Sequence, residues 1–205
     1  MRVAWAICRR DLVAAFTMPL MWLVLAAWAF LLDAVFVWLL YAVREQGATD
    51  EPLFVSVLGA AVWLLMPLAP ALTMNAFAAE RAQGTLQLLL TAPVREIDLV
   101  LGKFLALAVT MAALLVAMAP QPLVLAFISD VDPLHLAVGV GALALCCALF
   151  AALGLWISLL VDSPVAAYVL TFAAIMVLIL VGIGGPHGPL EPLAAAIGLT
   201  ERTRA

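Results

Sequence analysis

The segment from Ala79 to Lys103, AERAQGTLQLLLTAPVREIDLVLGK, is a polar island between two apolar stretches of membrane-spanning length. It carries charged residues, glycine, threonine and proline in a defined order, whereas most of the remaining chain could dissolve in lipid. The island therefore marks a place where the chain leaves the membrane. Its position and composition indicate a docking element on the cytoplasmic side of a membrane protein.

The composition excludes an ordinary water-soluble domain. Of the 205 residues, 68% are hydrophobic and 11% are charged, and the mean hydropathy is +1.24. Soluble domains have about 45–50% apolar and about 25% charged residues. Too few polar residues are present to cover a surface in water, so the sequence predicts an integral membrane protein. The net charge of −4 says little about partners, because the distribution of charge matters more than its sum in such proteins.

Five apolar stretches reach the length of about 20 residues that a helix needs to cross the hydrocarbon layer. They cover residues 20–43, 53–78, 99–128, 134–161 and 164–184. We therefore expect an all-α membrane protein in which residues 1–205 form one transmembrane domain, a bundle of five helices. The tail, residues 185–205, is too short and too polar to span, and we expect only short helical pieces in it, around Leu193–Leu199.

Basic residues set the expected orientation, because loops rich in lysine and arginine stay in the cytoplasm. They gather before the first span and between the second and third: Arg2, Arg9, Arg10, Arg81, Arg95 and Lys103. The loop after the first span has Arg44 alone. We therefore expect the amino terminus and the polar island in the cytoplasm and the tail outside, although Arg202 and Arg204 oppose this. The odd number of spans leaves open a sixth helix beyond Ala205.

Residues 1–19 predict an amphipathic helix that lies on the membrane surface in contact with lipid. The apolar residues recur at helical spacing: Trp5, Cys8, Leu12 and Phe16. Arg10 and Asp11 are expected to point away from that stripe, and Pro19 should end the helix. The alternative is a basic flank that only sets topology. A cleavable signal peptide is not expected, because the first apolar run is long enough to span and stay.

The polar island itself predicts a short helix between two spans. Gly84 permits a sharp change of direction, Thr85 can cap a helix, and Pro93 prevents the helix from continuing. The leucines between them would leave much of this helix apolar, and such a helix fits a groove in another protein. The alternative is a loop whose leucines fold back onto the membrane bundle.

The sequence GTLQLLLTAPV, followed by LVLGKFLA, resembles the coupling segment of type 2 ABC exporter permeases. It is most similar to the small-permease branch that includes gliding-motility and nitrous-oxide-reductase maturation transporters. The matching positions are Glu80, Gly84, Thr85, Leu88, Leu89, Leu90, Thr91, Pro93, Val94, Gly102 and Lys103. The run Arg9-Arg10-Asp11, in the expected surface helix, also resembles this family. The sequence departs at Gln87, where an acidic residue is usual, and in its five expected spans, since members usually have six.

The resemblance implies a permease subunit beneath which a separate ABC ATP-binding subunit docks on segment 79–98. The docking residues would be Glu80, Arg81, Gly84, Thr85, Leu86, Leu88, Leu89, Leu90, Thr91 and Pro93. It also implies export across the bacterial inner membrane, together with a second permease copy or a related permease.

No cofactor and no enzymatic activity are expected in the chain itself. The phosphate-binding sequence G-x-x-x-x-G-K-[ST] is absent, because Gly102-Lys103 is followed by Phe104 and position 97 is Ile. ATP and Mg²⁺ are therefore expected in the partner subunit.

Two polar residues within the expected spans, Asp33 and Asn75, are candidates for a translocation pathway. A carboxylate in hydrocarbon is costly unless it is paired or faces water, so a helix–helix hydrogen bond is the other reading of Asp33. Asn75 and Thr73 could instead satisfy backbone groups freed by the prolines of the second span. Close helix packing is expected at four glycines: Gly139, Gly141, Gly154 and Gly182.

Metal binding and intramembrane catalysis have no support in the pattern. His135 and His187 have no ligand cluster beside them, and the three cysteines have the spacing of neither a disulfide framework nor a metal site. The Ser/His and His/Asp/Glu constellations that an enzyme would need are missing. Nucleic acid is not an expected partner. Two alternatives stay open: a membrane scaffold that binds a cytosolic partner through the same island, and a haem-exporter-like permease.

Overall fold

The fold was analysed in a computed structural model, which describes residues 2–46, 53–78, 81, 96–128 and 133–183. These residues form helices only, and the prediction of an all-α membrane bundle is confirmed. The helices are α1 (Arg2–Thr17), α2 (Pro19–Gln46), α3 (Leu53–Thr73), α6 (Glu96–Ala117), α7 (Pro120–Ile128), α8 (Pro133–Leu160) and α9 (Pro164–Ile183).

Five stretches of these helices are long and apolar enough to cross a membrane, as predicted. They are Pro19–Glu45, Leu53–Thr73, Ile97–Leu125, Leu134–Leu160 and Pro164–Gly182. The third stretch runs through two helices, α6 and α7. The remaining helix, α1, is shorter and packs against α6.

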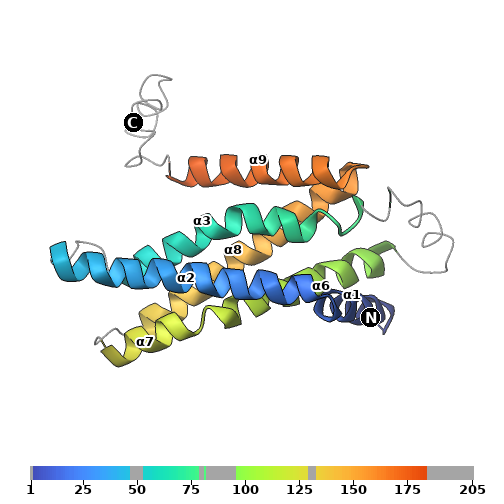
Figure 1. The fold of residues 1–205 in the computed structure, drawn as a ribbon. Coiled ribbons are helices and arrows are strands. Elements are labelled where there is room, and N and C mark those ends of the chain that lie inside the picture. The colour runs from blue at the N-terminus through green and yellow to red at the C-terminus, as the bar shows by residue number, and fades with distance from the viewer. Residues whose placement is uncertain (1, 47–52, 79–80, 82–95, 129–132, 184–205) are drawn as a thin grey trace, which may run out of the picture.

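The long helices lie side by side, with α3 between its neighbours α2, α8 and α9 (Figure 1). In the most apolar part of α3 and of α6, 39% of the residues are buried, compared with 17% for α2 and α9. Helix α3 packs against α2, α8 and α9, and helix α6 packs against α1, α2 and α8. One end of the bundle therefore brings together α1, the end of α3, the start of α6 and the α8–α9 turn. We call it the α1 end.

The core between these helices is apolar. Its fully buried members come from all five spans: Leu32, Ala61, Leu65, Ala69, Leu114, Phe150, Ala151 and Ile175. A polar contact crosses this core, where the indole Nε1 of Trp28 in α2 donates a 2.9 Å hydrogen bond to the carbonyl oxygen of Leu114 in α6. This bond satisfies the buried indole and fixes how α2 sits against α6.

The helices differ from the predicted spans in two places, and a proline explains the second. Helix α3 ends at Thr73, whereas the prediction carried the second span to residue 78. The third predicted span is divided, because α6 ends at Ala117 and α7 begins at Pro120. Pro120 has no N–H to continue the helical ladder, and the residue before a proline is driven away from helical geometry. The chain tightens there, with Ala119 N bonded to the carbonyl of Val116 at 3.0 Å.

Glycine permits close helix packing at two of the four predicted positions. A Cβ on Gly139 would come within 2.6 Å of the Phe54 ring, and one on Gly154 would overlap the Thr73 hydroxyl. At Gly141 and Gly182 none of the described residues comes within 4 Å. The prediction is therefore right for the first pair and wrong for the second, as far as the described residues go.

Candidate functional site

Helix α1 is seated on the start of α6 by a close approach of the two backbones. A Cβ on Gly102 would lie 2.8 Å from the carbonyl oxygen of Ala4, so only glycine fits this crossing. Ala4 and Cys8 are buried at the contact, whereas Trp5 is 65% exposed. The face of α1 that packs on the protein is thus not the predicted stripe through Trp5, although Cys8 belongs to both.

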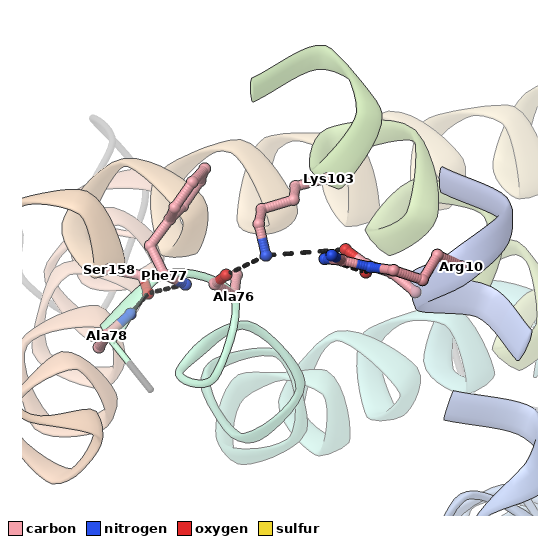
Figure 2. Close-up of polar contacts among 7 residues, drawn as sticks. Arg10, Ala76, Phe77, Ala78, Lys103 and Ser158 are labelled. Carbon is pink, nitrogen blue, oxygen red and sulfur yellow. Dashed lines mark hydrogen bonds and ion pairs between the residues drawn. The ribbon is translucent and has the colours of Figure 1, made fainter. Parts of the chain in front are cut away.

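Lys103 follows Gly102 and holds three elements together, as Figure 2 shows. Its Nζ donates a 2.6 Å hydrogen bond to the carbonyl oxygen of Ala76, just after α3. It also lies 3.7 Å from Asp11 Oδ2 of α1 and 4.9 Å from the centre of the Phe77 ring. The Lys103 side chain is only 5% exposed. Asp11, which the sequence analysis placed away from the apolar stripe of α1, thus faces α6.

Arg10 and Lys103 approach the Asp11 carboxylate through different oxygens. Arg10 bonds Asp11 Oδ1 at 2.9 Å, while Lys103 faces Oδ2. The Arg-Asp pair that the sequence placed in a surface helix thus joins that helix to α6. Arg9 is exposed on α1.

The other side of the same turn is held by Ser158 of α8. Its hydroxyl oxygen accepts hydrogen bonds of 3.1 Å from the backbone N–H groups of Phe77 and Ala78. The hydroxyl in turn donates toward the carbonyl of Met74, at 3.4 Å. These groups follow the end of α3, where the helix supplies no partners of its own. Ser158 therefore caps the turn from a neighbouring helix.

A third contact lies at the edge of this cluster. Arg81 Nη1 bonds Asp162 Oδ1 at 3.0 Å, between the start of the polar island and the α8–α9 turn. The two side chains are 38% and 84% exposed, and exposed ion pairs add little stability. This ion pair links the start of the polar island to the α8–α9 turn but adds little to the stability of the fold.

These contacts place the two ends of the polar island side by side. Ala76 lies just before the island, and Lys103 is its last residue. The 2.6 Å hydrogen bond between them therefore joins the two ends. The island therefore leaves and re-enters the bundle at one place, beside α1. The predicted docking residues other than Arg81 lie outside the described residues: Glu80, Gly84, Thr85, Leu86, Leu88, Leu89, Leu90, Thr91 and Pro93.

The pathway candidates lie in different parts of the bundle. Asp33, in the middle of α2, accepts a 2.6 Å hydrogen bond from Gln121 Nε2 of α7. Gln121 is 1% exposed, and its Oε1 has no hydrogen-bond partner among the described residues. The helix–helix hydrogen bond considered for Asp33 is thus present. Asn75 is exposed beyond the end of α3, while Thr73 bonds the carbonyls of Ala69 and Pro70.

Sequence reasoning missed Ser158 and Gln121. Each is a single polar residue in an apolar run, and no motif surrounds it. The only available signal was the cost of burying an unpaired polar group, which predicts a partner without naming it.

The described residues contain no group of His, Cys, Asp and Glu that could hold a metal ion. Burial, reinforced by the negative charge of Asp11, raises the pKa of the Cys8 thiol. Since the thiolate is the nucleophile and ligand, this thiol is poorly reactive at neutral pH. The cluster at the α1 end is therefore suited to holding elements in place and not to bond-making chemistry.

Comparison with known proteins assigns the family. Residues 44–198 match the model of the family described as ABC-2 family transporter protein, which is more than half of the chain. A search of curated proteins gives no match. The chain belongs to the ABC-2 transporter family. With its five apolar helices, it is a multi-pass membrane protein and the membrane component of a transporter, not itself an enzyme.

Proposed function

From this family membership, we propose that the chain is the permease subunit of an ATP-driven exporter and docks a separate ATP-binding subunit through residues 79–98. The observation that carries the proposal is that the polar island leaves the bundle and returns to it at the same place. Its two ends are joined by the bond from Lys103 to Ala76 and lie next to α1. Because the segment is held at both ends, a movement of a bound partner would be transmitted to the helices that hold it.

The charge distribution supports a cytoplasmic position for the α1 end. Arg9, Arg10, Arg81 and Lys103 belong to this end, whereas Arg44 lies in the last turn of α2 at the opposite end. Lysine and arginine are retained on the cytoplasmic side. The amino terminus would then be cytoplasmic, in a bacterial inner membrane.

The leucines of the island would fill a groove on the ATP-binding subunit, with Glu80 and Arg81 setting the register. ATP and Mg²⁺ would bind to that subunit, because the chain has no phosphate-binding loop. A second permease copy, or a related permease, would complete the pathway, with Asp33 and Asn75 as candidate lining residues. The motif GTLQLLLTAPV favours the small-permease branch with the gliding-motility and nitrous-oxide-reductase maturation transporters.

Replacing Leu88 by aspartate tests the docking role. The charge would enter an apolar groove without a partner, which is strongly unfavourable. We expect Leu88→Asp to insert into the membrane at wild-type level and to lose the ATP-binding subunit in affinity purification, detected by mass spectrometry. Leu88→Met, which keeps an apolar side chain of similar volume, should retain it. Undiminished recovery of the ATP-binding subunit with Leu88→Asp would refute docking at this segment.

A further inference from the structure

We infer that Lys103 is a positioning residue, which locks α1, the end of α3 and the start of α6 into one unit around both ends of the polar island. Its consequence for transport rests on the proposed function, whereas the lock itself is a property of this chain alone. The inference stands on the contacts around the ammonium group of Lys103 and not on its match to a motif.

The first step is the burial of a charge. The Lys103 side chain is 5% exposed, and a buried ammonium must be compensated by nearby acceptors. The compensation comes from two other elements: the Asp11 carboxylate of α1, and the Ala76 carbonyl with the Phe77 ring beyond α3. Moving either element away would remove part of this compensation, so the charge favours one arrangement of all three.

The second step extends the unit to α8. Ala76, whose carbonyl receives the Lys103 bond, is followed directly by Phe77, whose N–H is bonded to Ser158. The peptide unit between these residues is therefore held from two sides, by α6 and by α8 (Figure 2). A displacement of this peptide unit would therefore act on both helices.

The third step is the tight seat of α1. Gly102 lies directly before Lys103 and allows the close approach of Ala4, and Cys8 is 1% exposed in the same contact. A surface helix held by apolar contact alone could slide along α6. The ion pair between Asp11 and Lys103 adds a directional contact that fixes its register.

Stability alone is a weaker explanation for this charge. Buried ion pairs can often be replaced by apolar side chains of similar volume without loss of stability, because their desolvation offsets their attraction. Lys103→Met is therefore expected to fold, yet to release α1 from its fixed register. If Lys103→Met folds but α1 loses its fixed register, Lys103 has a positioning role and not a stabilising one.

Cys8 is a native reporter of the seat of α1. The chain is purified in detergent and treated with N-ethylmaleimide, and peptide mass spectrometry follows Cys8 separately from Cys146 and Cys147. We expect Cys8 of Lys103→Met to react at least about tenfold faster than in the wild type. Loss of a cation does not favour the thiolate, so faster labelling would report exposure. Lys103→Arg, which keeps the charge, and Arg9→Gln, which removes one elsewhere on α1, should react at the wild-type rate.

Hydrogen exchange of the α1 peptide gives a second measurement, on Asp11→Asn, should Lys103→Met fail to fold. Loss of the ion pair should increase amide exchange across residues 2–17, with no change for Arg9→Gln. A folded Lys103→Met with wild-type Cys8 labelling, or Asp11→Asn with wild-type exchange, would overturn the inference.

The complex distinguishes failure of the lock from failure of docking. With the ATP-binding subunit that copurifies with the wild type, Lys103→Met should retain the partner but lose at least about fivefold in transport-coupled ATP hydrolysis. Unchanged hydrolysis would contradict the positioning role. Retention of the subunit by Leu88→Asp would instead contradict docking and leave the Cys8 result standing.

Discussion

Two regions of this bundle are held together by different means. At the α1 end, polar side chains reach across helices to backbone groups: Lys103 to Ala76 and Ser158 to Phe77 and Ala78. Farther from that end, at the middle of α2, helices α2 and α7 meet through a side-chain pair, Gln121 and Asp33. The difference indicates that the α1 end is built to fix the backbone from which the polar island departs.

This contrast has a physical cause. Where α3 stops at Thr73, backbone N–H and C=O groups lose their helical partners and must find others. Neighbouring helices supply them at the α1 end, because the island must leave at a defined place. Within the spans, helical backbone groups satisfy each other and need no cap from a neighbouring helix.

Gly154→Ala should have the largest effect on stability. The added methyl group would overlap the Thr73 hydroxyl, which is itself bonded to Ala69, so α3 and α8 would have to separate near the α1 end. We expect a loss of about 3 kcal/mol, the upper part of the usual range for overpacking, measured by unfolding in detergent. Gly141→Ala is the matched control and should change little, since none of the described residues comes within 4 Å of it. Equal effects of the two would contradict the tight crossing.

Ser158→Ala should rank second. It removes the acceptor of two buried N–H groups, those of Phe77 and Ala78. Leaving buried donors unpaired is expected to cost about 2 kcal/mol. Thr110→Val is the control, because that hydroxyl only donates to the carbonyl of Ala106 in its own helix. If both variants lose the same free energy of unfolding in the same denaturant titration, the Ser158 cap on the turn after α3 stabilises the protein no more than the Thr110 hydroxyl does.

The polar pair at the middle of α2 should matter less. Asp33→Leu leaves the buried Gln121 amide without its partner, and we expect a loss of about 1 kcal/mol. The double variant Asp33→Leu/Gln121→Leu should regain most of it, because both polar groups are then removed. A double-mutant cycle of unfolding free energies measures this coupling, and strictly additive losses would show that the pair does not interact.

The exposed ion pair should have the smallest effect. Arg81→Gln breaks the contact with Asp162, and exposed pairs contribute about 0.2–1 kcal/mol. The loss should shrink further in high salt, because salt screens exposed charges. A loss as large as that of Ser158→Ala, independent of salt, would show that Arg81 belongs to the buried cluster.

The sequence predicted the helices well and their contacts poorly. Hydropathy is a local property, so the five spans were evident, and Pro120 accounts for the division of the third. The bond between Phe77 and Ser158 joins residues 81 positions apart, and nothing local to either residue specifies the other. The contact between Asp11 and Lys103 was missed for a similar reason: the stripe of a surface helix predicts an apolar face but not which neighbour the helix meets. Gly102 and Lys103 were identified through a family motif, yet their contact with α1 became evident only in three dimensions.

Cysteine accessibility in intact cells tests the cytoplasmic position of the α1 end most directly. In a variant without the native cysteines, single substitutions Gln46→Cys, Asp132→Cys and Gln83→Cys would be treated with a membrane-impermeant maleimide. Because basic residues gather at the α1 end, we expect labelling at positions 46 and 132 in intact cells, and labelling at 83 only after the cells are opened. Labelling of Gln83→Cys from outside would invert the orientation and remove the polar island from the reach of any cytoplasmic ATP-binding subunit.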